Sequence, residues 1–159
     1  MRPPEKTGNC RPRAIDIDPN WTWGYIKLGR TLSLQKKCTE AIAQSDIAER
    51  RIASGGSPFS RSWLGSTYAT CGDVARARQK LTEMHAIEAT RYVDPMTFAG
   101  VHASLGELDE ALRWYQKGLA DRSPDMVYVM VALRITPQLA HSAGYQAIVD
   151  RMAFPNPIK

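Results

Sequence analysis

The feature that most constrains the fold of this chain is a recurring pair of small residues. Three small residues follow one another at intervals of 36 and 34 positions, and each has an alanine 12 positions after it. The pairs are Gly29 with Ala41, Gly65 with Ala77, and Ala99 with Ala111. Small residues on two facing helices let the backbones approach closely, while larger neighbours fill the flanks. This register of small residues therefore predicts three units, each made of two packed helices.

Helix starts are marked by dipeptides that join an N-cap side chain to a proline suited to the first helical position. They are Asp18-Pro19, Ser57-Pro58, Asp94-Pro95, Ser123-Pro124 and Thr136-Pro137. Glycines at 55–56, 72 and 106 mark breaks between helices. We expect helices near 20–35, 38–53, 58–70, 73–89, 95–104, 107–121, 124–133 and 137–153. Because no segment shows sustained strand-like alternation, the sequence predicts an all-α fold.

The spacing resembles that of tetratricopeptide repeats, which are helix–turn–helix units of about 34 residues. The matching positions include Leu28, Gly29, Leu32 and Ala41 in the first unit, Leu64, Gly65, Tyr68 and Ala77 in the second, and Phe98, Ala99, Ala111 and Tyr115 in the third. The resemblance implies a short right-handed α-solenoid of about three repeats with a C-terminal capping helix. Three positions depart from the pattern. Ser45 stands where an aromatic residue is usual, and Arg61 and Pro95 replace large apolar residues.

These patterns divide the chain into an arm, a repeat region, a cap and a tail. The parts are a disordered basic arm at 1–13, repeats at 14–123, a helical cap at 124–153 and a tail at 154–159. Within the repeat region we distinguish a remnant of a preceding repeat at 14–21 and units at 22–56, 57–91 and 92–123. In the cap, an apolar stripe with helical spacing can cover the last unit. It consists of Tyr145, Ile148, Val149 and Met152. The cap resembles the closing segment of repeat regions in bacterial winged-helix regulators and nucleotide cyclases.

Charge and hydropathy indicate which partners are unsuitable. The net charge is +5, and residues 1–13 supply +3 of it, since the other 146 residues carry 17 basic and 15 acidic side chains. The folded part is therefore close to neutral, and we expect no nucleic-acid partner. The longest apolar run, at 126–133, is too short to span a bilayer, and the N-terminus shows no secretory signal. We expect a cytoplasmic protein without a membrane partner.

The reactive side chains do not form a recognisable centre in the sequence. Three cysteines without C-x-x-C spacing argue against a disulfide framework and a zinc site, so we expect free thiols that act as small hydrophobic residues. The three histidines have no second ligand at helical spacing. We therefore expect no catalytic centre, no metal and no cofactor. Most of the tryptophans and tyrosines fall on the repeat's packing pattern, so filling of the core is their expected role.

The first helices of successive repeats line the concave face of such a solenoid, where partners bind. The inward register predicts a partner-binding set that includes one cation, Arg30, as an exposed anchor. The set is Trp23, Ile26, Arg30, Phe59, Ser62, Ser66 and Met96. We therefore expect a non-catalytic scaffold that binds a protein or peptide segment. Two alternatives stay open. Trp23 and Phe59 can instead be core residues, and the chain can be a regulatory or sensor fragment of a transcriptional regulator or nucleotide cyclase that lacks its N-terminal effector domain.

Overall fold

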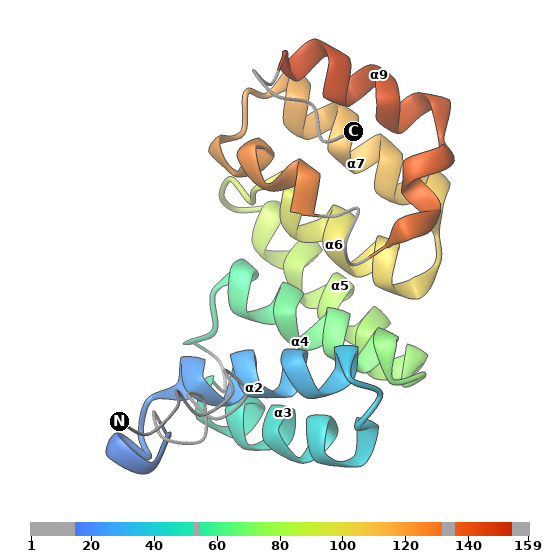
Figure 1. Ribbon diagram of the computed structural model, residues 1–159. Coiled ribbons are helices and arrows are strands. Elements are labelled where there is room, and N and C mark those ends of the chain that lie inside the picture. The colour runs from blue at the N-terminus through green and yellow to red at the C-terminus, as the bar shows by residue number, and fades with distance from the viewer. Residues whose placement is uncertain (1–14, 53–54, 132–135, 154–159) are drawn as a thin grey trace, which may run out of the picture.

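A computed structural model describes residues 15–52, 55–131 and 136–153 of the chain, and these residues form helices and turns without a strand (Figure 1). The helices are α2 Thr22–Leu34, α3 Cys38–Ile52, α4 Pro58–Thr70, α5 Val74–Glu88, α6 Pro95–Leu105, α7 Leu108–Ala120, η2 Pro124–Tyr128, η3 Pro137–His141 and α9 Ala143–Met152. The prediction of an all-α fold is thus confirmed for the described residues. None of the described helices is long and apolar enough to cross a membrane.

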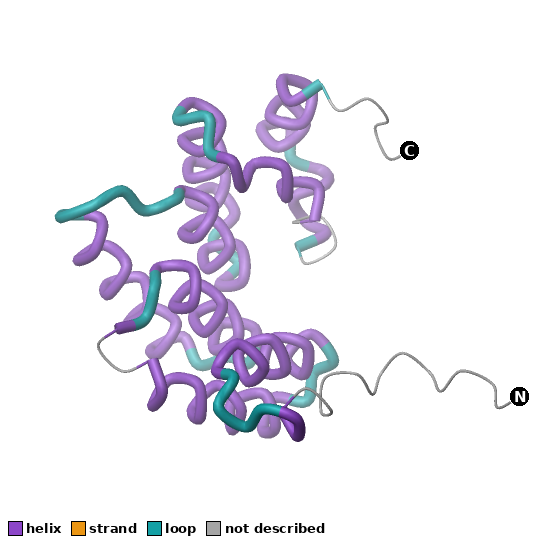
Figure 2. Tube along the Cα trace, turned by 90° about the vertical axis from the view of Figure 1, so that its left-hand side faces the viewer, coloured by secondary structure: helices purple, strands orange, loops and turns teal. Residues whose placement is uncertain are grey.

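The long helices pair in chain order, α2 with α3, α4 with α5 and α6 with α7, and α4 packs between α2 and α6. Figure 2 shows that the stack follows a C-shaped course, with the N-terminal helices at one end and the C-terminal helix at the other. The buried apolar side chains form three clusters along this stack rather than one central core. Each helix pair therefore shares its buried surface with its neighbours in the stack.

The predicted small-residue contacts hold the paired helices together. A Cβ atom added to Gly29 would lie 2.7 Å from Ser45 Oγ and 3.1 Å from the Ala41 carbonyl oxygen, both on α3. One added to Gly65 would lie 3.2 Å from Lys80 Cβ on α5 and 3.2 Å from a Val101 methyl on α6. All four alanines of the register are fully buried, namely Ala41, Ala77, Ala99 and Ala111. The predicted close approach is confirmed for α2 with α3 and for α4 with α5, and Gly65 also faces α6.

Three of the five predicted capping dipeptides act as expected. Ser57 Oγ accepts from Ser60 N, an Asp94 carboxylate oxygen accepts from Met96 N, and Ser123 Oγ accepts from Asp125 N. Thr136 precedes η3 but makes no capping hydrogen bond with its side chain.

The predicted helix start after Asp18 is wrong. Trp21 N donates to the Asp18 carbonyl oxygen and Asn20 N donates to the Asp18 carboxylate, so the segment forms a separate turn. Helix α2 begins only at Thr22.

The C-terminal part is less regular than predicted. Instead of one helix over 124–133 there is a 3₁₀ turn, η2, followed by helical residues 129–131, and the segment 137–153 divides into η3 and α9. The predicted apolar stripe nevertheless packs on α7. Tyr145 and Ile148 are buried, while Val149 and Met152 are partly buried against the same cluster. The predicted arm at 1–13 and tail at 154–159 lie outside the described residues.

The expectation of free thiols is wrong for two of the three cysteines. Cys38 and Cys71 form a disulfide with Cα atoms 5.3 Å apart, and Cys10 lies outside the described residues. Cys38 is the first residue of α3, and Cys71 is the C-cap of α4. Their sequence separation of 33 is close to one repeat length, so the stacking of successive units brings them to the same edge. The absence of C-x-x-C spacing was therefore a poor guide, because long-range packing makes this pair.

Candidate partner-binding surface

Three aromatic side chains meet where the N-terminal halves of α2 and α4 pack together. The Trp23 ring centroid lies 5.4 Å from that of Phe59 and 6.1 Å from that of Trp63, and the Phe59 and Trp63 centroids are 5.9 Å apart. Trp23 and Trp63 also pack against the buried residues of the first two helix pairs, whereas Phe59 is 46 % exposed. The cluster is thus anchored in the core on one side and open to solvent on the other.

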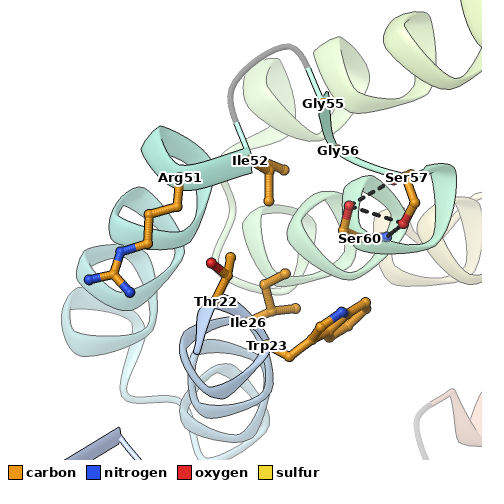
Figure 3. A pocket seen from close by; sticks show the side chains of 9 residues that line it. All are labelled: Thr22, Trp23, Ile26, Arg51, Ile52, Gly55, Gly56, Ser57 and Ser60. Carbon is orange, nitrogen blue, oxygen red and sulfur yellow. Dashed lines mark hydrogen bonds between the residues drawn. The ribbon is translucent and has the colours of Figure 1, made fainter. Parts of the chain in front are cut away.

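Two depressions border this cluster, and Trp23 lines both. The first has a volume of about 390 Å³ and lies between the start of α2, the end of α3 and the turn before α4. Figure 3 shows Ile26, Ile52 and Trp23 around it. The second, about 320 Å³, is lined by Trp21, Trp23, Lys27 and Phe59. Trp21 is 41 % exposed, so the second depression presents aromatic surface to solvent.

Backbone and hydroxyl contacts shape the wall of the first depression. Ser60 N and Ser60 Oγ both bond back to Ser57, at 3.2 Å to its Oγ and 2.8 Å to its carbonyl oxygen (Figure 3). A Cβ atom on Gly56 would lie 2.8 Å from Ile52 Cδ1, so only glycine fits there without displacing Ile52. Arg51 lines the rim, but its guanidinium points away (Figure 3). It lies over the Tyr25 ring, 4.5 Å from the centroid, and donates to the Pro19 carbonyl oxygen.

The expectation that Arg30 is an exposed anchor is wrong. Only 8 % of Arg30 is exposed, and its guanidinium donates to the Ser66 carbonyl oxygen at 2.9 Å, to Thr70 Oγ1 at 2.7 Å and to Ser104 Oγ at 3.4 Å. Burial lowers the pKa of Arg30 to about 10, which still leaves it charged at neutral pH. Arg30 therefore connects α2 to α4 and α6.

The other predicted site residues divide between the surface and the interior. The structure brings Trp23 and Phe59 together, and Ile26 lies behind them with 1 % exposure. Ser62 and Ser66 are buried on α4, and Ser62 Oγ donates to the Thr97 carbonyl oxygen at 2.7 Å. Met96 is partly buried in the cluster around α7. Of the seven predicted residues, Trp23 and Phe59 offer the surface that a partner can reach in this region.

Several residues of this surface were not predicted, among them Trp21, Lys27, Ile52 and Trp63. A signal for Trp63 was present, since it follows Phe59 by four positions and so lies on the same side of α4. The position of Ile52 depends on how the end of α3 meets the turn before α4, which sequence spacing does not specify.

Apolar and aromatic side chains make up much of this surface. It consists of aromatic rings, isoleucines and hydroxyls bonded to backbone, with Lys27 at one edge. In the described ranges, no three His, Cys, Asp or Glu side chains gather as a metal site. In the comparisons with known proteins, no protein-family model, no curated protein and no solved structure matches the chain.

Proposed function

We propose that the chain is a non-catalytic, cytoplasmic scaffold that binds a segment of another protein. The observation that carries this proposal is the half-open aromatic cluster of Trp23, Phe59 and Trp63. Large aromatic side chains held on rigid helices dominate the affinity of many protein interfaces. Here two helices fix three rings, so little conformational freedom is lost when a partner covers them.

The lining of the two depressions suggests the chemistry of the partner. An apolar, aromatic or proline side chain fits against the rings of Trp21, Trp23 and Phe59. We infer an extended or helical segment that presents an apolar or aromatic anchor.

The architecture proposed for this scaffold is a right-handed solenoid of three tetratricopeptide-like repeats closed by a C-terminal cap. In its support, three helix pairs stack in chain order and the small-residue register lies at their contacts. Packing of α9 on α7 covers the last pair in the way that a terminal cap does.

Phe59→Glu tests the proposed surface. Peptides are first selected from a random display library on the full-length chain, and their affinity is then measured by titration of tryptophan fluorescence. Because Phe59 is half-exposed, the substitution is expected to leave the melting temperature within a few degrees while it weakens the selected peptides tenfold or more.

A matched control is Tyr92→Glu, which places the same charge at a 65 % exposed aromatic residue between the second and third helix pairs. Tyr92→Glu should leave affinity unchanged. If both variants bind the selected peptides equally well, or if Tyr92→Glu rather than Phe59→Glu weakens binding, the aromatic cluster is not the partner-binding surface.

A further inference from the structure

The Cys38–Cys71 disulfide lies at the edge of the helix stack, outside the three buried clusters. It joins the start of α3 to the end of α4, and so links the first helix pair to the second. Both cysteines are partly exposed rather than buried. A thiol from solution can therefore reach the bond without opening the core, as exchange requires.

The surroundings of Cys38 favour its thiolate form. Cys38 begins a helix of 15 residues, whose N-terminal N–H groups attract negative charge. Exposed Lys36 and Lys37 precede it directly, while the one acidic residue in this first turn is Glu40. Cys71 has the opposite position, at the C-terminal end of α4. When the bond opens, Cys38 is therefore the better leaving group, because the sulfur with the more stable thiolate leaves faster.

The two helix pairs that the disulfide links are also held together without it. Tyr68 on α4 donates to Glu49 on α3 at 2.6 Å, and Arg76 on α5 pairs with Asp46 on α3 at 2.6 Å. Tyr68 is itself part of the buried cluster shared by these pairs. Opening the disulfide leaves all of these contacts in place, so both redox forms are expected to be folded.

From these observations we infer that Cys38 and Cys71 form a reversible redox site that exchanges with low-molecular-weight thiols. The inference does not rest on the proposed binding function. It also accommodates a cytoplasmic location, where disulfides are usually transient and redox-sensing rather than permanent.

The exchange takes place in two steps. A glutathione thiolate attacks Cys71 Sγ, so that a glutathione–Cys71 mixed disulfide forms, the Cys38–Cys71 bond breaks and Cys38 leaves as a thiolate. A second glutathione thiolate attacks the glutathione sulfur of this mixed disulfide and releases the Cys71 thiolate. Two electrons pass to the protein, the protons of the two glutathione thiols end on Cys38 and Cys71, and glutathione disulfide is the product.

The equilibrium test uses the full chain with Cys10→Ser, which removes the third thiol. The protein is incubated in buffers that range from fully oxidised to fully reduced glutathione, trapped by alkylation and analysed by mass spectrometry. Both redox forms should occur within this range, and the helical circular dichroism should be the same in each. A pair that stays entirely oxidised or entirely reduced throughout, or a chain that unfolds on reduction, would overturn the inference.

The kinetic test compares chains that carry Cys10→Ser and retain a single cysteine. Cys71→Ser leaves Cys38 free and Cys38→Ser leaves Cys71 free. At pH 7 iodoacetamide should alkylate Cys38 at least fivefold faster than Cys71. Replacing Lys36 and Lys37 by glutamine should reduce this advantage, whereas replacing both by arginine should preserve it. Equal alkylation rates for the two thiols, or no effect of the glutamine pair, would refute Cys38 as the leaving sulfur.

Discussion

Gly29 and Ser45 form a tight contact between α2 and α3, and this contact explains why position 45 carries a small residue where the resemblance led us to expect an aromatic one. Ser45 is fully buried, and the position of a Cβ atom on Gly29 is 2.7 Å from its hydroxyl oxygen. No aromatic ring fits into that space. The hydroxyl has no hydrogen-bond partner among the described residues, so the close approach of the helices is achieved at the cost of an unsatisfied polar atom.

Ser45→Ala is therefore expected to stabilise the protein by about 1 kcal/mol, since it removes a buried hydroxyl that gains no hydrogen bond in return. Urea unfolding measures the change. Gly29→Ala should destabilise the folded protein. The double variant with Gly29→Ala and Ser45→Ala should recover only part of that loss, because the Ala41 carbonyl oxygen remains 3.1 Å from the new Cβ atom. A destabilised Ser45→Ala would mean that the hydroxyl has a partner, such as a buried water.

Arg61 explains a second departure from the repeat pattern. Where a large apolar residue is usual, its guanidinium pairs with Glu83 on α5, and its Nε donates to the Gly56 carbonyl oxygen at 3.2 Å. The side chain thus replaces an apolar contact by a polar one that also holds the turn before α4.

At the scale of the elements, α3 and α5 are joined across α4 by a network of charges around Lys80. The Lys80 side chain is 3 % exposed and pairs with Glu49 and with Glu83, the latter at 2.8 Å. Burial raises the pKa of Glu49, but hydrogen bonds from Lys80 and Tyr68 outweigh it, so the net pKa lies below the usual 4.5. Glu49 therefore stays ionised in the folded protein at pH values where it is protonated in the unfolded chain.

This shift predicts a specific dependence of stability on pH. A carboxylate whose pKa is lower in the folded state stabilises the fold above its unfolded pKa, near 4.5, and the contribution is lost as the pH falls through the folded pKa. Glu49→Gln should lower the free energy of unfolding by about 1–3 kcal/mol at pH 7. The difference from the wild type should shrink as the pH falls below 4.5.

Urea titrations at several pH values measure this difference. Glu40→Gln, at an exposed position on the same helix, is the matched control and should change little. A difference for Glu49→Gln that is independent of pH would refute the linkage.

How far each element could be predicted depends on whether its determinants are local. The six long helices lie within about two residues of their predicted bounds because capping side chains, prolines and the small-residue register are all local signals. The C-terminal segments were predicted less well, since short 3₁₀ turns have a weaker periodicity than α-helices. Arg30 and the Cys38–Cys71 pair were misjudged because their partners lie on other helix pairs. The spacing in one sequence predicts which helices pair but not which side chains meet between the pairs.

At the scale of the whole molecule, the C-terminal segment completes the last of three clusters. Tyr145 stacks edge-on against Tyr115 with ring centroids 6.0 Å apart, and its hydroxyl donates to the Val129 carbonyl oxygen. Removal of residues 136–159 would therefore uncover the apolar side of α7. We expect the truncated chain to self-associate and to lose stability, because an exposed apolar patch of this kind promotes association.

Light scattering coupled to size exclusion, together with urea unfolding, measures both effects. Deleting only 154–159 is the control. Ile148→Ala, at a residue that is 2 % exposed, should weaken the same contact by about 2–5 kcal/mol without removing the helix. A truncated chain that remains monomeric and equally stable would contradict the capping role.

The disulfide also changes the chain when it is unfolded. With the bond closed, the unfolded polypeptide is a ring with two tails rather than a linear coil, and the ring spans the 33-residue separation of Cys38 and Cys71. In the chain-entropy description, a ring of this size has lost conformational freedom equivalent to roughly 3–4 kcal/mol. Opening the bond returns that freedom to the unfolded ensemble, while the contacts of Tyr68 and Arg76 with α3 are expected to keep the folded helices in place. The redox state of one peripheral bond is thus expected to set how much of the protein is folded at a given temperature, even where the folded helices pack alike in both forms.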